Sequence, residues 1–355
     1  MASLTAGAQG SGHADTSIIT QTITENNGWR RRDDSPIPAM DNAVIWANYE
    51  DGGLWSVGGY GSEGAAQRYD PATGGWLTYT NLLTPVIEYP MDGCYGLSAV
   101  GDEIIVLFPD TIVTGTLQIF NITQRSWYTE PVPAPGYPAE GRWGQDIVSM
   151  LQHTGENLCY LSGGSMQEGG GRTKDLWKYD PGTNTAEYLD KFPASIWFGF
   201  HASWYVPWVG DDGAICVAGG VDHNHQINDS TQCYDIRGDS FNTLNADLGT
   251  LPEPWWGMAD GWQVTDEGYE LWIANGVAQD GTLLPVSAYI REGMSGFEYS
   301  SGIPHGLYRL EGDAWENQFY TLNGSRGGFW YSEFSLHLAP CPTCHSIYLP
   351  LILKN

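Results

Sequence analysis

Short apolar runs recur along the chain, and most of them end in a glycine pair or in a remnant of one. Apolar runs of this length, bounded by turn residues, predict short β-strands rather than helices. The clear copies are LWSVGGY at Gly58–Gly59, LCYLSGG at Gly163–Gly164 and AICVAGG at Gly219–Gly220. The weaker copies are LWIANG at Asn275–Gly276, FYTLNG at Asn323–Gly324 and IIVLFPD near Phe108–Pro109.

A second pattern follows the glycine pairs. It is Tyr-Asp-Pro or a variant of it, usually with an aromatic residue about six positions later. The copies are Tyr69-Asp70-Pro71 with Trp76, Phe120-Asn121 with Trp127, Tyr234-Asp235 with Phe241, and Tyr179-Asp180-Pro181, which lacks the later aromatic. Asp, Asn, Pro and Gly favour tight turns, and we expect the aromatic rings to pack one sheet on the next.

A third pattern is a short loop of the form X-Gly or X-Asn before the next strand. The X residues are Asp41, Asp92, Trp143, Phe198, Trp256 and His305, spaced 49 to 58 residues apart. Each of the six units reads as four short strands joined by turns, which is the composition of a propeller blade. The sequence therefore predicts an all-β fold.

Together the three patterns resemble kelch repeats over residues 17–340. The resemblance implies a six-bladed β-propeller with four-stranded blades, like the central domain of galactose oxidase. The segment Ile23–Trp29 looks like the end of a repeat without its beginning, so we expect this N-terminal strand to complete the last blade and close the ring. Residues 1–16 are then a flexible N-terminal segment, and residues 341–355 form a Cys-containing apolar tail.

Charge narrows the range of partners. The chain has 15 Lys and Arg against 42 Asp and Glu, a formal net charge of −27. Such a surface repels nucleic-acid phosphates and anionic membranes, whereas a cation, a neutral glycan or a basic protein patch stays possible. The first residues lack a basic segment followed by an apolar core, and the apolar stretch Ile347–Leu353 is too short to span a bilayer, so we expect a soluble chain.

The loops that carry the X residues are expected to surround one mouth of the central channel. Aromatic faces there could stack on sugar rings while acids accept hydrogen bonds, although the same side chains could simply plug the propeller axis. The candidate ligand-binding residues are Asp41, Tyr89, Asp92, Trp143, Trp197, Phe198, Trp255, Trp256 and His305.

An enzyme that acts on a sugar or peptide terminus at the channel mouth is the alternative. Kelch-like enzymes such as sialate mutarotases and glutaminyl cyclases use Glu, Arg and His near the channel, and the candidates here are Glu88, Asp92, Arg142 and His305. This interpretation requires the four side chains to converge on one pocket. Neither a Gly-x-Ser-x-Gly elbow nor a glycine-rich phosphate loop before a helix occurs in the sequence.

Metal and haem sites are two further candidates. The loop residues Asp222, His223 and His225 offer two imidazoles and a carboxylate for a divalent metal. The tail motif Cys341-Pro-Thr-Cys344-His345 has the c-type haem attachment pattern. Its cysteines also suit a disulfide.

The other cysteines are expected to be structural. Cys216 and Cys233 lie on adjacent strands and are candidates for a disulfide, whereas Cys94 and Cys159 are expected to be buried and unpaired.

These patterns favour a non-catalytic, extracellular or cell-surface module from a bacterium. It would recognise a protein or a glycan through the aromatic and acidic loop face. A structural subunit held in a surface assembly by the C-terminal tail is the remaining alternative, because Tyr348-Leu349-Pro350-Leu351 resembles short tails at the ends of exported bacterial proteins.

Overall fold

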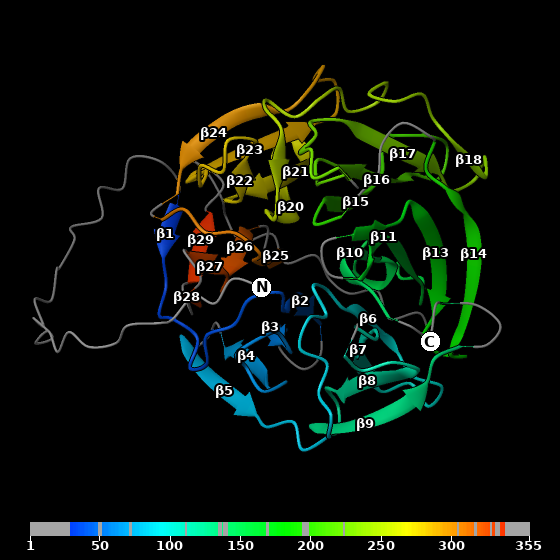
Figure 1. Ribbon diagram of the computed structural model, residues 1–355, viewed down its shortest axis with the longest axis vertical. Coiled ribbons are helices and arrows are strands. Elements are labelled where there is room, and N and C mark those ends of the chain that lie inside the picture. The colour runs from blue at the N-terminus through cyan, green and yellow to red at the C-terminus, as the bar shows by residue number, and fades with distance from the viewer. Residues whose placement is uncertain are drawn as a thin grey trace, which may run out of the picture.

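The computed structural model describes residues 29–337, apart from residues 49–51, 71–72, 111, 134–136, 138–140, 168–169, 194–198, 223, 304, 316–317, 327–328 and 331–333. Within these residues the chain forms antiparallel β-sheets arranged around a central axis (Figure 1). The helical structure described is one 3₁₀ turn, η1 (Met150–Gln152). No helix of the described part is long and apolar enough to cross a membrane. The protein is an all-β propeller.

Five sheets have four strands each, whereas the sequence predicts six four-stranded blades. From the inner strand outward, they are β2 (Ala43–Ala47), β3 (Gly53–Val57), β4 (Ala66–Asp70) and β5 (Gly75–Tyr79); β6 (Cys94–Leu97), β7 (Glu103–Leu107), β8 (Thr116–Asn121) and β9 (Ser126–Pro131); β15 (Ala202–Val206), β16 (Ala214–Ala218), β17 (Thr231–Asp235) and β18 (Ser240–Phe241); β20 (Ala259–Thr265), β21 (Gly268–Ala274), β23 (Val286–Arg291) and β24 (Glu298–Gly302); and β25 (Glu311–Trp315), β26 (Gln318–Leu322), β29 (Phe334–His337) and β1 (Trp29–Arg31).

A further sheet departs from the four-stranded pattern. Its main path is β10 (Trp143–Ser149), β11 (Cys159–Gln167), β13 (Asp175–Asp180) and β14 (Thr185–Lys191). β12 (Gly170–Arg172) adds a fifth strand because β11 is long enough to pair with it beyond the edge of β13. Two small two-stranded sheets pair β19 (Trp255–Trp256) with β22 (Val277–Ala278) and β27 (Ser325–Arg326) with β28 (Phe329–Trp330).

The core lies between neighbouring sheets. Ile45 on β2 and Trp55 on β3 pack in one cluster with Ile105 on β7 and Phe120 on β8, which belong to the next sheet. Inner strands are therefore buried on both faces where two sheets pack, and all five residues of β3 and of β16 are buried. The outermost strand β14 is mostly exposed or half-buried, and this explains why only the inner strands stand out as continuous apolar runs.

The glycine pairs have a conformational cause. Both members of each pair have positive φ, for example 69° at Gly58 and 94° at Gly59, and the Asn-Gly copies behave alike, with 62° at Asn275 and 107° at Gly276. Gly and Asn are the residues that adopt this region most readily. At Gly59 a Cβ atom would also lie 2.7 Å from the Cβ of Asn42. The second residue of the pair therefore approaches the start of the inner strand closely.

These pairs also join neighbouring sheets. The N–H of Gly220 donates to the carbonyl of Trp255 at 2.7 Å, and the N–H of Gly276 donates to that of Leu307 at 2.7 Å. An equivalent hydrogen bond runs from the N–H of Gly324 to the carbonyl of Ala39 at 2.9 Å. It links the last glycine pair of the chain to the loop that leads into the first inner strand.

The Tyr-Asp turns and the Phe-Asn variant close the outer hairpin of four sheets. The side chains of Asp180 and Asp235 accept hydrogen bonds from the N–H groups of Gly182 (2.8 Å) and Gly238 (2.9 Å). The paired aromatics lie opposite each other across this hairpin, so they stabilise two strands of the same sheet. These pairs are Tyr69–Trp76, Phe120–Trp127 and Tyr234–Phe241, with ring centroids 5.2–5.4 Å apart.

Two disulfides are present. Cys216 and Cys233 face each other on β16 and β17 and are bonded. The expectation that Cys94 and Cys159 are unpaired is wrong, because they form a disulfide between β6 and β11, which belong to neighbouring sheets. The sequence could not show this pairing, because the two residues are 65 positions apart.

The N-terminal strand lies on the last sheet. Trp29 to Arg31 pair antiparallel with β29 at Ser335 to His337. The Trp29 ring is buried against Phe319, with centroids 5.8 Å apart, and its Nε1–H donates to the Oγ of Ser287 at 3.1 Å. Strand β1 therefore covers the outer edge of β29, and of the predicted closing segment Ile23–Trp29 only Trp29 lies within the described residues.

Candidate functional site

Six residues with positive φ form a circle where the chain enters the inner strands. Five backbone hydrogen bonds of 2.7–3.1 Å join them in sequence around the axis, and one of these runs from the N–H of Asp41 to the carbonyl of Arg309. We call this circle the annulus. Its members are Asp41, Met91, Gly144, Phe200, Gly257 and Arg309, with φ between 55° and 65°.

A chain of aromatic rings lies next to the annulus, with one ring from each successive repeat. Consecutive rings contact one another with centroids 5.3–6.1 Å apart, four of these contacts edge-to-face and the first stacked. Apart from Phe200, which is 8% exposed, the rings are half-buried and so present part of their surface to solvent. We call this set the aromatic face. It consists of Tyr60, Tyr89, Trp143, Phe200, Trp256 and Tyr308.

Arg309 lies at the centre of the aromatic face. Its guanidinium carbon is 6.0 Å from the ring centroids of Tyr89, Trp143 and Phe200, a distance at which cation–π attraction operates. Its Nε–H donates to the Oδ1 of Asp41 at 2.6 Å, and a second N–H donates to the Oδ2. This bidentate ion pair fixes the guanidinium in place and leaves the centre of the face without net charge.

Burial shapes the electrostatics of the pair. It raises the pKa of Asp41, although the Arg309 charge and hydrogen bonds act in the opposite direction. Burial lowers the pKa of Arg309, but the attraction of Asp41 outweighs it, so the pKa of Arg309 is raised. Burial, followed by the charge of Glu88, raises the pKa of Tyr89 to about 12, so its hydroxyl is neutral at pH 7.

A second feature lies inside the ring of inner strands. It is a cavity of about 50 Å³ lined by residues of β2, β10, β15, β20 and β25 and of the segment before β6. Its carboxylates are Asp92, Asp146, Asp260, Glu311 and Asp313. Each of them is at most 8% exposed.

Some of these carboxylates satisfy backbone groups of the next sheet. Asp92 Oδ2 accepts from the N–H of Ile147 at 2.9 Å, and Asp313 Oδ2 accepts from the N–H of Trp46 at 2.7 Å. An inner strand has an unpaired edge toward the channel, and a buried N–H needs a partner there. The inward acids therefore have a structural role in addition to any role in binding.

The crowding of acids perturbs their ionisation. Burial raises the pKa of Asp146 to about 7 and that of Asp313 to about 6. Burial, followed by the charge of Asp146, raises the pKa of Asp92, Asp260 and Glu311 well above the usual values. Burial also lowers the pKa of His153, which lines the same cavity, to about 4.

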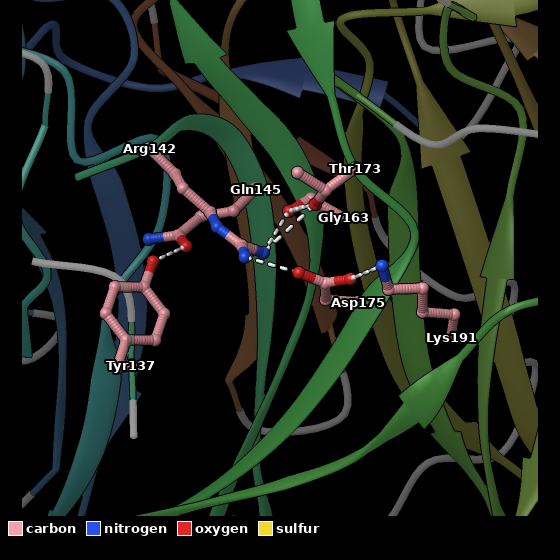
Figure 2. A network of polar contacts seen from close by, with 7 residues as sticks. All are labelled: Tyr137, Arg142, Gln145, Gly163, Thr173, Asp175 and Lys191. Atoms are coloured by element: carbon pink, nitrogen blue, oxygen red, sulfur yellow. Dashed lines mark hydrogen bonds and ion pairs between the residues drawn. The ribbon is translucent and has the colours of Figure 1, made fainter. Parts of the chain in front are cut away.

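Arg142 has a different environment from the one expected of a catalytic residue. It is 2% exposed, and Figure 2 shows its guanidinium directed at the carbonyl of Gly163 (3.1 Å), the hydroxyl of Thr173 (3.0 Å) and Asp175 (2.6 Å). Lys191 approaches the other oxygen of Asp175 at 3.7 Å. Arg142 therefore connects the start of β10 to β11 and β13 within one sheet.

The four candidate catalytic residues do not share the cavity. Asp92 lines it, whereas Glu88, Arg142 and His305 do not. Glu88 and His305 are half-buried, and Arg142 is buried in its own sheet. The four side chains therefore do not converge in this cavity.

The candidate ligand-binding residues divide into groups. Tyr89, Trp143 and Trp256 belong to the aromatic face, and Asp41 lies at its centre. Asp92 lies in the cavity instead. Trp255 is fully buried, and its Nε1–H donates to the carbonyl of Asn275, so it belongs to the core. Trp197 and Phe198 lie outside the described residues.

The described residues show no binding arrangement for the metal and haem candidates. Asp222 Oδ1 accepts from the N–H groups of Asn224 (2.7 Å) and Gln226 (2.8 Å), which makes it the anchor of a turn, and His225 is exposed. His223 lies outside the described residues, as do Cys341, Cys344 and His345.

Sequence reasoning missed part of both features. The sequence analysis does not identify three rings of the aromatic face, Tyr60, Phe200 and Tyr308. It also does not identify Arg309 at the centre of the face or four of the five cavity carboxylates. A signal for the acids exists, because Asp146, Asp260 and Asp313 stand in otherwise buried inner strands reading GQDIV, ADGW and EGDAW. An acid in such a strand faces either the core or the channel.

No protein-family model matches the chain, and no curated protein matches it either. Among solved structures, the chain resembles the one described as "Structure of YjhT", a propeller protein, with a TM-score of 0.61 and 15% sequence identity. The likeness covers 85% of this chain and 95% of that one. It supports the propeller fold.

Proposed function

We propose that the protein is a non-catalytic binding module that recognises a neutral glycan on its aromatic face. The observation that carries this proposal is the continuous chain of six rings, one from each repeat, around a charge-neutral Arg309–Asp41 pair. Aromatic faces bind the C–H surfaces of sugar rings, and a centre without net charge suits an uncharged ligand. A protein partner is the competing ligand, and the experiment below separates the two.

The proposal includes an extracellular or cell-surface location. Four cysteines of the described part form two disulfides, and one of these joins neighbouring sheets. Disulfides persist in oxidising compartments and are rare in the cytosol. An acidic net charge of −27 also suits a protein that must stay dissolved outside the cell.

We further propose that the propeller is a closed, six-bladed ring of kelch-type repeats. Three observations on the described residues support closure: the pairing of β1 with β29, the hydrogen bond from Gly324 to Ala39, and that from Asp41 to Arg309. The glycine pairs and the Tyr-Asp turns support the kelch type. The sheet that contains β12 counts as one blade with an added strand.

A glycan array probed with the disulfide-bonded protein tests the function. We expect binding to one class of neutral oligosaccharide, and we expect Tyr89→Ala and Trp256→Ala each to weaken it about tenfold, the value of one lost aromatic contact. The matched control is Tyr188→Ala. Tyr188 is a 43% exposed aromatic on the outer strand β14 and lies away from the aromatic face.

Two results would contradict the proposal. One is a wild-type protein that binds no neutral glycan on the array. The other is equal loss of binding in the Tyr188→Ala control, which would place the ligand elsewhere. Melting curves of the three variants separate lost contacts from lost folding.

A further inference from the structure

Three acids from three different inner strands meet in the channel cavity. Asp146 on β10, Asp260 on β20 and Glu311 on β25 each offer one oxygen, and these oxygens lie within 4.8 Å of one another. The residues are separated by more than 50 positions in the sequence, so only the ring of sheets brings them together. Like charges at this distance repel strongly when they are buried.

Two polar atoms at the cavity are unsatisfied. Asp146 Oδ2 and Ser203 Oγ are buried and lack a hydrogen-bond partner of regular geometry, and both residues line the cavity, where the Ser203 hydroxyl lies close enough to Asp146 to favour its ionised form. Asp146 is 5% exposed and Ser203 is 6% exposed. A buried oxygen without a partner is costly, and binding of an ion is one of the usual ways in which such an oxygen is satisfied. Ser203 is not part of the acidic cluster, and its buried hydroxyl, which has no regular hydrogen-bond partner, also points to a bound ligand.

No described side chain that lines the cavity carries a positive charge to neutralise the cluster. Among the described residues that line the cavity there are five carboxylates and neither a lysine nor an arginine. Arg309 of the annulus does not line the cavity, and its charge is already paired with Asp41. Positive charge must therefore come from protons or from a bound cation.

The donor atoms indicate the type of cation. Carboxylate and hydroxyl oxygens are ligands for hard cations, and Ca²⁺ accepts flexible arrangements at about 2.3–2.6 Å. Three atoms no more than 4.8 Å apart share a point about 2.8 Å or less from each of them, which a small side-chain adjustment brings into the calcium range. A cavity of about 50 Å³ holds an ion with a few waters.

We propose that the channel of this propeller binds one calcium ion between Asp146, Asp260 and Glu311, with the hydroxyl of Ser203 as a further oxygen donor. The ion links three inner strands that are distant in sequence and occupies the channel beneath the annulus. This proposal is independent of the glycan-binding function. The calcium site can be tested in the absence of any glycan.

The test is a calcium titration of full-length protein that has been treated with EDTA and desalted. We expect one Ca²⁺ per chain by isothermal titration calorimetry, and a melting temperature a few degrees higher in calcium than in EDTA. Mg²⁺ requires shorter bonds in a near-octahedral shell, so it should bind more weakly. The absence of binding by Ca²⁺, or tighter binding by Mg²⁺ than by Ca²⁺, overturns the assignment.

Glu311→Gln provides the decisive variant. It should weaken calcium binding at least about tenfold, because a ligand charge is lost. In EDTA it should melt at or above the temperature of the wild type, because one of several crowded carboxylates is gone, and this separates lost binding from misfolding. Glu292→Gln is the matched control, since Glu292 is exposed and distant from the cavity lining. Calcium affinity of Glu311→Gln within twofold of the wild type would overturn the proposal.

Discussion

Neighbouring residues in this chain can have opposite roles, as Trp255 and Trp256 show. Both lie on β19, where successive side chains point to opposite faces. Trp255 is fully buried and hydrogen-bonded to Asn275, whereas Trp256 is half-buried in the aromatic face. The sequence identifies both as candidates, but it does not say which of the two faces the solvent.

Arg142 shows how a buried cation stabilises a blade. Arg142→Met should lower the free energy of unfolding by about 2–4 kcal/mol, because Asp175 loses its buried partner, and the Gly163 carbonyl and the Thr173 hydroxyl each lose one charged donor. Chemical denaturation measures this directly. Arg237→Met is the control, since Arg237 is 62% exposed and its ion pair with Asp211 at 3.2 Å should contribute less than about 1 kcal/mol. Equal losses in the two variants would contradict the role assigned to Arg142.

At the residue scale, the conformational signals were the most predictable. Gly58–Gly59 and Asn275–Gly276 are recognisable because few other residues tolerate consecutive positive φ. Phe200 and Arg309 also have positive φ, at 55° and 56°, but no glycine marks them. The expected loop positions therefore fell on Phe198 and His305, two and four residues too early. The aromatic face was found only in part for that reason.

At the scale of elements, the strands themselves were predictable from the apolar runs, but their lateral links were not. The disulfide between β6 and β11 joins two sheets, and that between β16 and β17 lies within one sheet. Only the second could be anticipated, because antiparallel neighbours in one sheet are close by construction. Contacts between sheets depend on how the sheets pack, which periodicity along the chain does not encode.

The two disulfides should differ in their contribution to stability. Their sequence separations are 65 and 17 residues. On the chain-entropy view these separations correspond to about 4 and about 3 kcal/mol. We therefore expect the Cys94→Ala/Cys159→Ala protein to unfold at lower denaturant than the Cys216→Ala/Cys233→Ala protein. Denaturation of both double variants under non-reducing conditions measures the difference, and the opposite order would show that the link between sheets is of minor importance.

The clustering of the inner-strand acids could not be predicted from the sequence. Asp260 and Glu311 lie on different strands and come together only because β20 and β25 are neighbours around the axis. Gly261 and Gly312 allow this approach, since a Cβ atom on either would lie 2.6 Å from the ring of Phe319. Sequence spacing predicts the repeat. It does not predict which inward positions of six repeats meet.

At the scale of the whole molecule, the account depends on how the first and last repeats join. Removal of residues 1–31 deletes β1 and exposes the outer edge of β29 and the Phe319 ring that Trp29 covers. We expect this truncated protein to melt at a lower temperature and to associate, because an open strand edge is a template for pairing. The control begins at Trp29 and keeps the strand. Size-exclusion chromatography and melting curves compare the two, and a monomeric, equally stable Δ1–31 protein would contradict closure by β1.

The central claim is that the aromatic face recognises an uncharged glycan, and one titration tests it most directly. Binding of the oligosaccharide selected on the array is measured by calorimetry at about 50 mM and about 500 mM NaCl. The electrostatic screening length differs clearly between these two salt concentrations. The account predicts the same affinity at both salt concentrations for the wild type, and a loss of about tenfold in Trp256→Ala. No measurable binding, or binding unchanged by Trp256→Ala, would contradict it. A wild-type affinity that falls steeply with salt would contradict it too, because it would point to a charged partner attracted by the acidic surface.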